Sequence, residues 1–195
     1  MPQVFEHRGD GELWCTMHRS DAEAIALVSD QLRELIEGET READPIVERL
    51  FPRAYLDPTE EQAERDWDAF VRPDLASGKV AALAALADAL RRAASSSTAD
   101  EAGNIVESGV GNLVQTRLGE QDAELWLSAL HDLRLALGTR LGVGEEGVPE
   151  ENDAEDLEAA WWSVYDYLTW FQGMLVEELL VADRPGRPSD PRDDG

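Results

Sequence analysis

The sequence predicts a mainly α protein, a single-domain helical bundle with a small N-terminal β-hairpin. Apolar residues recur at intervals of three and four along most of the chain, which is the spacing of one helix face. Asp-Pro steps and glycines separate these segments at the points where helices begin and end. With 43% apolar residues in 195, the chain can bury one core. We expect one domain over residues 1–183 and a disordered Pro/Gly tail over 184–195.

The N-terminal segment predicts a hairpin followed by a helix. Val4 to His7 and Leu13 to Thr16 are strand-like runs on either side of Gly9-Asp10-Gly11, where glycine permits the positive φ of a tight turn. Ser20 with Glu23 forms a capping-box pattern at the start of the helix. Gly38 marks its end.

Two Asp-Pro steps each predict a helix start. Asp is a favoured N-cap, and proline at the first helical position loses an N–H that has no helical partner. Asp44-Pro45 therefore begins a short helix through Phe51, and Asp57-Pro58 begins another to about Phe70. Asp74, after the break at Pro73, caps a further helix.

The second half predicts one or two short strands within 104–118 and then two long helices. Asp122 to Arg140 is strongly amphipathic, and Asn152 caps a last helix that reaches about Val181. Asp21-Ala22-Glu23 recurs as Asp122-Ala123-Glu124, 101 residues later and after a similar strand-like run. This echo indicates a duplicated strand–helix unit, with chance among acidic, alanine-rich helices as the alternative.

The last helix carries the densest aromatic pattern. Its main stripe predicts the central core element, with Trp161 and Phe171 substantially buried. Gly173 in mid-helix predicts close approach by a neighbouring helix. A second face, with Trp162, Tyr167 and Trp170, is the candidate partner-binding surface, because Trp and Tyr are common interface anchors.

Arg134 and Arg140 complete the candidate partner-binding residues. They are basic residues in a very acidic chain, and the alternative is simple pairing with nearby acids on the surface.

Net charge excludes several function classes. The chain has 17 Lys and Arg against 42 Asp and Glu, a formal charge of −25. Direct nucleic-acid binding and binding to an anionic membrane both draw on cationic side chains, so we expect neither. No run approaches the roughly 20 apolar residues that span a bilayer. A single cysteine, Cys15, excludes an internal disulfide and fits a cytoplasmic location.

The search for chemistry predicts no catalytic, metal or cofactor residues. Cys15 and His18 have the Cys-x-x-His spacing, but a structural zinc site needs four ligands and no second pair follows. The sequence has no nucleophile elbow, and the glycine-rich run 108–112 lacks the features of a phosphate-binding loop. We expect a protein that is not an enzyme and has no cofactor.

Three segments resemble an actinobacterial family of domains of unknown function. They are Asp44-Pro-Ile-Val-Glu-Arg-Leu-Phe-Pro-Arg-Ala-Tyr-Leu-Asp57, Asp132-Leu-Arg-Leu-Ala-Leu-Gly-Thr-Arg-Leu-Gly142 and Tyr165-Asp-Tyr-Leu-Thr-Trp-Phe-Gln172. Members of the family are commonly encoded beside the ClpS adaptor of the Clp protease, and some are described as transcriptional regulators. The resemblance implies no catalytic residues.

Three functions remain open. The first is a non-enzymatic cytoplasmic interaction or regulatory protein, with ClpS or other Clp protease components as the partners that the resemblance implies. The second is a transcriptional regulator that acts through a protein partner, since the chain has no basic recognition helix. The third is an enzyme with a carboxylate-based site, which would need a pocket holding several carboxylates.

Overall fold

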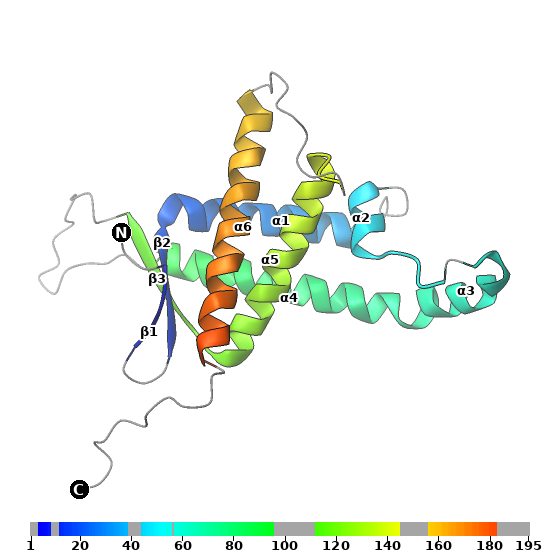
Figure 1. Cartoon of the computed structure of the whole chain (residues 1–195), viewed down its shortest axis with the longest axis horizontal. Coiled ribbons are helices and arrows are strands. Elements are labelled where there is room, and N and C mark those ends of the chain that lie inside the picture. Colours follow the sequence, from blue (N-terminus) through cyan, green and yellow to red (C-terminus); the bar gives the residue numbers. More distant parts are fainter. Residues whose placement is uncertain are drawn as a thin grey trace, which may run out of the picture.

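The computed structural model describes residues 4–8, 12–38, 44–55, 57–95, 112–144 and 156–182. It confirms the mainly α class, with a small antiparallel sheet at one end (Figure 1). The strands are β1 (Phe5–His7), β2 (Leu13–His18) and β3 (Leu113–Leu118). The helices are α1 (Arg19–Glu37), α2 (Pro45–Leu50), α3 (Glu61–Phe70), α4 (Arg72–Ser95), α5 (Glu120–Arg140) and α6 (Asp156–Ala182), with a short 3-10 turn, η2 (Pro58–Glu60), before α3.

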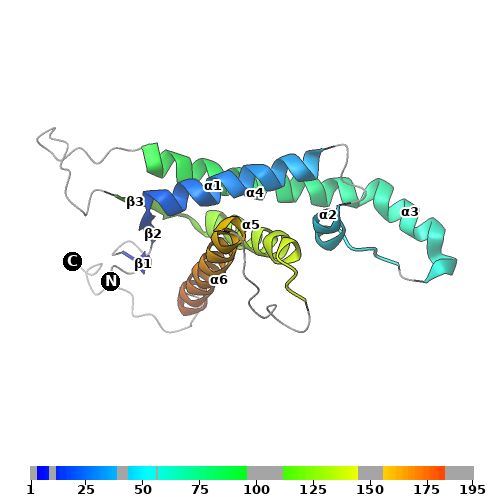
Figure 2. The same cartoon turned by 90° about the horizontal axis from the view of Figure 1, so that it is seen from above.

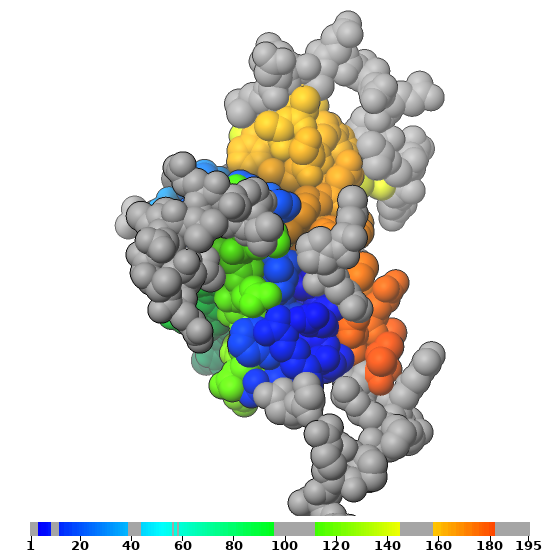
Figure 3. Space-filling model, turned by 90° about the vertical axis from the view of Figure 1, so that its left-hand side faces the viewer, coloured from blue at the N-terminus to red at the C-terminus, as the bar shows by residue number. Residues whose placement is uncertain are grey.

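The sheet has the order β1-β2-β3 and confirms the N-terminal hairpin. β2 pairs antiparallel with both neighbours: Cys15 of β2 lies opposite Phe5 of β1, and Leu13 of β2 lies opposite Leu118 of β3. Figure 3 shows this end of the molecule, where the blue N-terminal strands lie between green β3 and orange α6. The strands bury one face of the sheet in the core, with the side chains of Phe5, Leu13, Cys15 and Leu118.

The predicted N-cap at Ser20 is wrong. α1 begins at Arg19 directly after β2, and its N-cap residue, His18, makes no side-chain cap bond. The Arg19 amide instead donates to the Asn112 carbonyl at 2.7 Å, and Ser20 Oγ bonds to the Asp21 carboxylate. The bond between Arg19 and Asn112 extends the pairing of β2 with β3 to the first residue of the helix, so α1 begins one residue before Ser20.

Both Asp-Pro caps are confirmed. The Ile46 amide donates to Asp44 Oδ1 at 2.8 Å at the start of α2, and the Thr59 amide donates to Asp57 Oδ1 at 2.8 Å at the start of η2. The helix expected from Asp74 begins two residues earlier, at Arg72, because proline is tolerated in a first turn. The expected cap at Asn152 and the tail lie outside the described residues.

The helices form two layers (Figure 2). α1 and α4 run antiparallel along one side, while α2, α5 and α6 lie on the other, and α3 extends beyond the body at the end of α4. α5 contacts α1, α2, α4, α6 and β3, whereas α6 packs mainly on α5 and β1.

The central helix is therefore α5, and the prediction of a central last helix is wrong. Trp126 of α5 is 1% exposed and is the largest fully buried side chain, while Trp161 of α6 is only partly buried. Phe171 is fully buried, as expected, and its ring lies 4.9 Å from that of Phe5. Gly173 is exposed with open space where a Cβ would stand, so no neighbour requires glycine there.

A buried ion pair ties α4 to α5. Lys79 Nζ lies 2.6 Å from Asp132 Oδ1, and the Asp132 side chain is 1% exposed. Asp132 Oδ2 has no hydrogen-bond partner among the described residues. Such an ion pair fixes a packing geometry but contributes little net stability, because the Asp132 carboxylate has lost its water, whereas Lys79 is 23% exposed.

Within the described ranges, no helix combines the length and apolar character that a bilayer span requires.

Candidate functional site

The five predicted partner-binding residues do not form one surface. They fall into three groups around α5 and α6, each with its own aromatic partner. These groups are Arg134 with Tyr165 and Trp162, Arg140 with Trp161, and Tyr167 with Trp170.

Tyr167 faces inward. Its ring stacks on Phe171 at 5.8 Å, and its hydroxyl hydrogen bonds to the Asp21 carboxylate at the start of α1. Burial raises the pKa of Tyr167 above its usual range, and the Asp21 charge adds to that rise. Trp170, in contrast, is 48% exposed and packs one side against the Tyr167 ring at 5.6 Å. Of this pair, Trp170 is the residue that a partner can reach.

Arg134 lies in a basic hollow on the outer side of α5. The hollow, about 230 Å³ in volume, is lined by Arg49, His131, Arg134 and Tyr165 among others, and no described acidic residue lines it. Arg134 is held by neutral groups, with Nε donating to Thr169 Oγ1 at 3.0 Å and Nη1 to Gln172 Oε1 at 2.7 Å. No described acidic residue neutralises its charge.

Gly138 allows α5 and α6 to approach closely at the wall of this hollow. A Cβ at Gly138 would lie 3.3 Å from Tyr165 Cε2, so the absence of a side chain lets Tyr165 of α6 approach α5 closely. The close helix approach expected at Gly173 occurs here instead.

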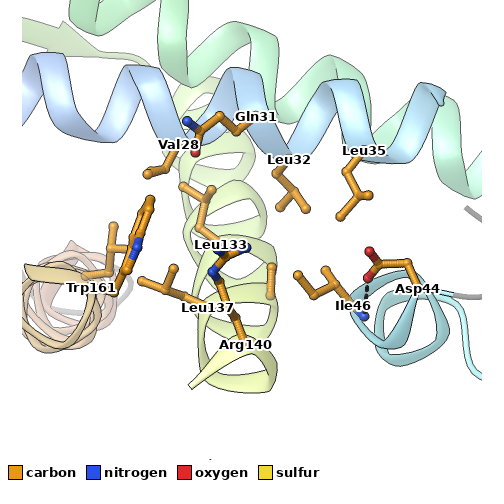
Figure 4. Close-up of a pocket in the computed structure, with 12 residues that line it drawn as sticks. Val28, Gln31, Leu32, Leu35, Asp44, Ile46, Leu133, Leu137, Arg140 and Trp161 are labelled. Atoms are coloured by element: carbon orange, nitrogen blue, oxygen red, sulfur yellow. Dashed lines mark hydrogen bonds between the residues drawn. The ribbon is translucent and has the colours of Figure 1, made fainter. Parts of the chain in front are cut away.

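Arg140 lies in a pocket between α1, α2, α5 and α6 (Figure 4). The pocket has a volume of about 400 Å³. Its walls are mostly aliphatic, and the Arg140 guanidinium lies 5.6 Å from the Trp161 ring centre, a cation–π distance. The lining residues are Val28, Gln31, Leu32, Leu35, Asp44, Ile46, Leu133, Ala136, Leu137, Arg140, Trp161 and Leu168.

The junction of α3 and α4 exposes an apolar tip that the sequence analysis missed. Phe70 is 76% exposed, Val71 41% and Leu75 44%. These three residues, the arm tip, lie where α3 projects from the body (Figures 1 and 2). Their signal in the sequence is an apolar run at a helix junction, but only the fold shows that nothing described covers them.

Comparison of the whole chain with models of known protein families identifies its family. The model of a domain of unknown function, DUF2017, matches residues 2–179. The chain belongs to the DUF2017 family. The match spans every helix and strand described above except the last three residues of α6.

Curated relatives of this DUF2017 protein carry a functional name. Proteins named "Oxidative stress regulator AosR" from Mycobacterium bovis and from two strains of Mycobacterium tuberculosis are 32% identical to it over 167 residues. The alignment covers 78% of this chain and 67% of each relative. Their source fits the actinobacterial resemblance, whereas the ClpS neighbourhood stays a prediction. No solved structure shows a significant match.

Cys15 is a poor candidate for a reactive thiol in this DUF2017 protein. It lies in β2, is 1% exposed, and burial raises its pKa above the usual range. Because the thiolate is the reactive form, the Cys15 side chain is protected in two ways: reagents cannot reach it, and it stays protonated. Within the described ranges, no group of three or more His, Cys, Asp or Glu side chains is placed to hold a metal ion.

Proposed function

We propose that this DUF2017 protein is a non-enzymatic regulator of the oxidative stress response that acts by binding a partner protein. Its similarity to proteins named as oxidative stress regulators, across most of the chain, supports the regulatory role. Among the earlier alternatives, this similarity favours a regulatory role over an enzymatic one.

The arm tip is the observation that carries the partner-binding mechanism. Exposed apolar side chains that gather on one projection typically mark an interaction site. Phe70, Val71 and Leu75 gather at the junction of α3 and α4. A projecting helix pair also presents these side chains without rearrangement of the core.

Charge defines the kind of partner that fits the arm. α3 exposes three acids, Glu61, Asp66 and Asp68, while its fourth acid, Glu64, is buried and pairs with Arg53. A partner segment that combines apolar anchors with Lys or Arg would match both properties of this surface. ClpS or a Clp subunit is the first partner to test, as the resemblance implies, and the exposed Trp170 offers a second, separate contact.

The test uses deletion of the gene in its native host. The strain is complemented with the wild type, with Phe70→Ser/Leu75→Ser, or with the control Leu180→Ser, and survival and transcript levels are measured after hydrogen peroxide. Leu180 is 65% exposed on α6, so the control removes an equally accessible apolar side chain away from the arm. The wild type and the control should restore the response, while the double variant should not, at equal protein levels.

Two results would contradict the proposal. An unchanged peroxide response in the deletion strain would remove the regulatory role. Full rescue by the double variant would remove the arm as the docking surface. Affinity purification then identifies the partner, which should be lost from the double variant and retained by the Leu180 control.

A further inference from the structure

We propose that the pocket between α1, α2, α5 and α6 binds a small amphiphilic carboxylate, an organic acid with an aliphatic or aromatic body. This inference concerns ligand binding and goes beyond the partner-docking function. It rests on the shape of the pocket and on a guanidinium that has no counter-ion among the described residues.

The size and walls of the pocket fit an apolar body. Ligand pockets are typically about 300–1,000 Å³ and mainly hydrophobic, with a few polar groups that set orientation. This pocket, of about 400 Å³, has aliphatic walls from four helices, including Val28, Leu32, Leu133 and Leu137. Figure 4 shows these side chains converging from α1 and α5 on one space.

Arg140 supplies the charge that selects an anion. It has no ion pair with any described residue, whereas Arg65 and Arg117 pair with Glu61 and Glu12. Its one described contact is the face of the Trp161 ring, which orients a guanidinium but does not neutralise it. A guanidinium has five N–H donors in a planar fork that matches a carboxylate, so an acid head group fits this site.

The lining has two other polar residues, and the one carboxylate among them, Asp44, lies away from the end where Trp161 and Arg140 meet. Asp44 lies at the α2 end of the pocket, across from Trp161, and its carboxylate accepts the Ile46 amide at 2.8 Å (Figure 4). Gln31 projects from α1 toward the same space, and its amide can donate to the ligand head group.

The strongly negative net charge of the protein makes any preference for an acid over a neutral ligand evidence for a local cation. A protein with a formal charge of −25 repels anions and attracts cations over its surface as a whole. General electrostatics therefore disfavour an acid relative to a neutral molecule of the same length. Tighter binding of the acid must come from local cations, and Arg140 is the cation in this pocket.

The experiment compares decanoate with decanol on the full chain. Both have the same apolar length, both are used below their aggregation concentrations, and binding is followed by calorimetry and by tryptophan fluorescence, since Trp161 lines the pocket. We expect one decanoate per chain, bound at least about tenfold more tightly than decanol, a factor equal to about 1.4 kcal/mol.

Three variants locate the site. Arg140→Gln should weaken decanoate binding at least about tenfold and leave decanol unchanged, because a charge-assisted hydrogen bond is lost. Arg65→Gln on α3 makes the same change in net charge away from the pocket and should have no effect. Ala136→Leu should weaken both ligands by filling the space. Arg140 is exposed, so its loss should leave folding intact, checked by circular dichroism.

Each contrary result overturns the proposal. No saturable decanoate binding removes the ligand class, and equal binding by Arg140→Gln removes the anchor. An equal loss in Arg65→Gln reduces the effect to net charge, and unimpaired binding by Ala136→Leu places the ligand elsewhere. Phe70→Ser/Leu75→Ser should bind decanoate normally, so the ligand site and the docking arm can fail independently.

Discussion

The Lys79–Asp132 ion pair predicts an asymmetry between its two single substitutions. Lys79→Met keeps the alkyl stem but leaves the Asp132 carboxylate without a partner in a position that is 1% exposed. Removing one member of a buried pair in this way costs about 3–5 kcal/mol. Asp132→Leu leaves the ammonium of Lys79 instead, and the Lys79 side chain, at 23% exposure, can turn its charge to water. The second change should cost clearly less.

The double variant tests the same reasoning from the other direction. Asp132 Oδ2 already has no hydrogen-bond partner among the described residues, so the wild-type pair carries an unrecovered desolvation cost. Lys79→Met/Asp132→Leu removes both charges and should be at least as stable as either single variant. Apolar replacement of a buried pair is often neutral or stabilising by about 1–4 kcal/mol.

Urea denaturation and thermal melting measure these differences. A loss of 3–5 kcal/mol should lower the melting temperature by about 10 °C in a chain of this size. Arg65→Met breaks the exposed pair with Glu61 and serves as the control, with an expected change within about 0.5 kcal/mol. Equal losses in the two single variants, or a double variant as unstable as Lys79→Met, would refute the argument.

Three further predictions follow from burial and pKa. Cys15 should react with a thiol reagent only slowly in the native protein and fully in urea; fast native labelling would contradict its burial and raised pKa. Phe171→Ala should lower the free energy of unfolding by about 3–5 kcal/mol, whereas Trp170→Ala should cost far less, because only Phe171 is fully buried. Hydrogen bonds from the Thr59 amide and hydroxyl lower the pKa of Asp57. That stabilisation is present above the unfolded-state pKa and is lost as pH falls through the folded one. An NMR titration should therefore place the pKa of Asp57 below its ordinary value, with Thr59→Ala removing only the smaller, side-chain part.

Local signals predicted the helix starts that depend on local bonds. Asp44 and Asp57 cap helices because an Asp side chain two residues from an amide can reach it in almost any tertiary setting. Ser20 is not an N-cap because the helix begins at Arg19, directly at the end of β2, where the Arg19 amide bonds to the Asn112 carbonyl.

Aromatic density misled the assignment of the core. α6 is richest in Trp, Tyr and Phe, yet those side chains point in several directions around a helix that packs mainly on α5 and β1. α5 carries Leu and Ala with one Trp, Trp126, and meets five elements. Small and aliphatic residues let several helices approach one another, whereas aromatic composition indicates only the area available for burial.

The sequence identified Arg134 and Arg140 as candidate binding residues but could not show that they lie in different cavities. They lie six residues apart on α5, and the structure places Arg134 in the outer basic hollow and Arg140 in the inner pocket. The function of each depends on its neighbours, Thr169 and Gln172 for one and Trp161 for the other. None of those neighbours is adjacent in sequence.

The 101-residue echo gains structural support and connects to the pocket. β2 and β3 pair so that Leu13 lies opposite Leu118 and Met17 lies opposite Val114. An offset of 101 residues relates Leu13 to Val114 and Met17 to Leu118, so the two pairs are equivalent under the echo. Each strand leads into a helix, and burial matches at equivalent helix positions, with Leu32 and Leu133 both at 5% exposure or less.

The candidate pocket lies where these two helices meet. Leu32 and Leu35 of α1 are equivalent to Leu133 and Ala136 of α5, and all four side chains line it. A duplicated strand–helix unit stays a prediction, and it would explain why residues at equivalent positions of α1 and α5 line the same pocket. Arg140 lies beyond the repeated positions, near the end of α5. The anion-selecting charge would then be an addition to the second unit, which is why the pocket has an apolar body common to both helices and one charged end.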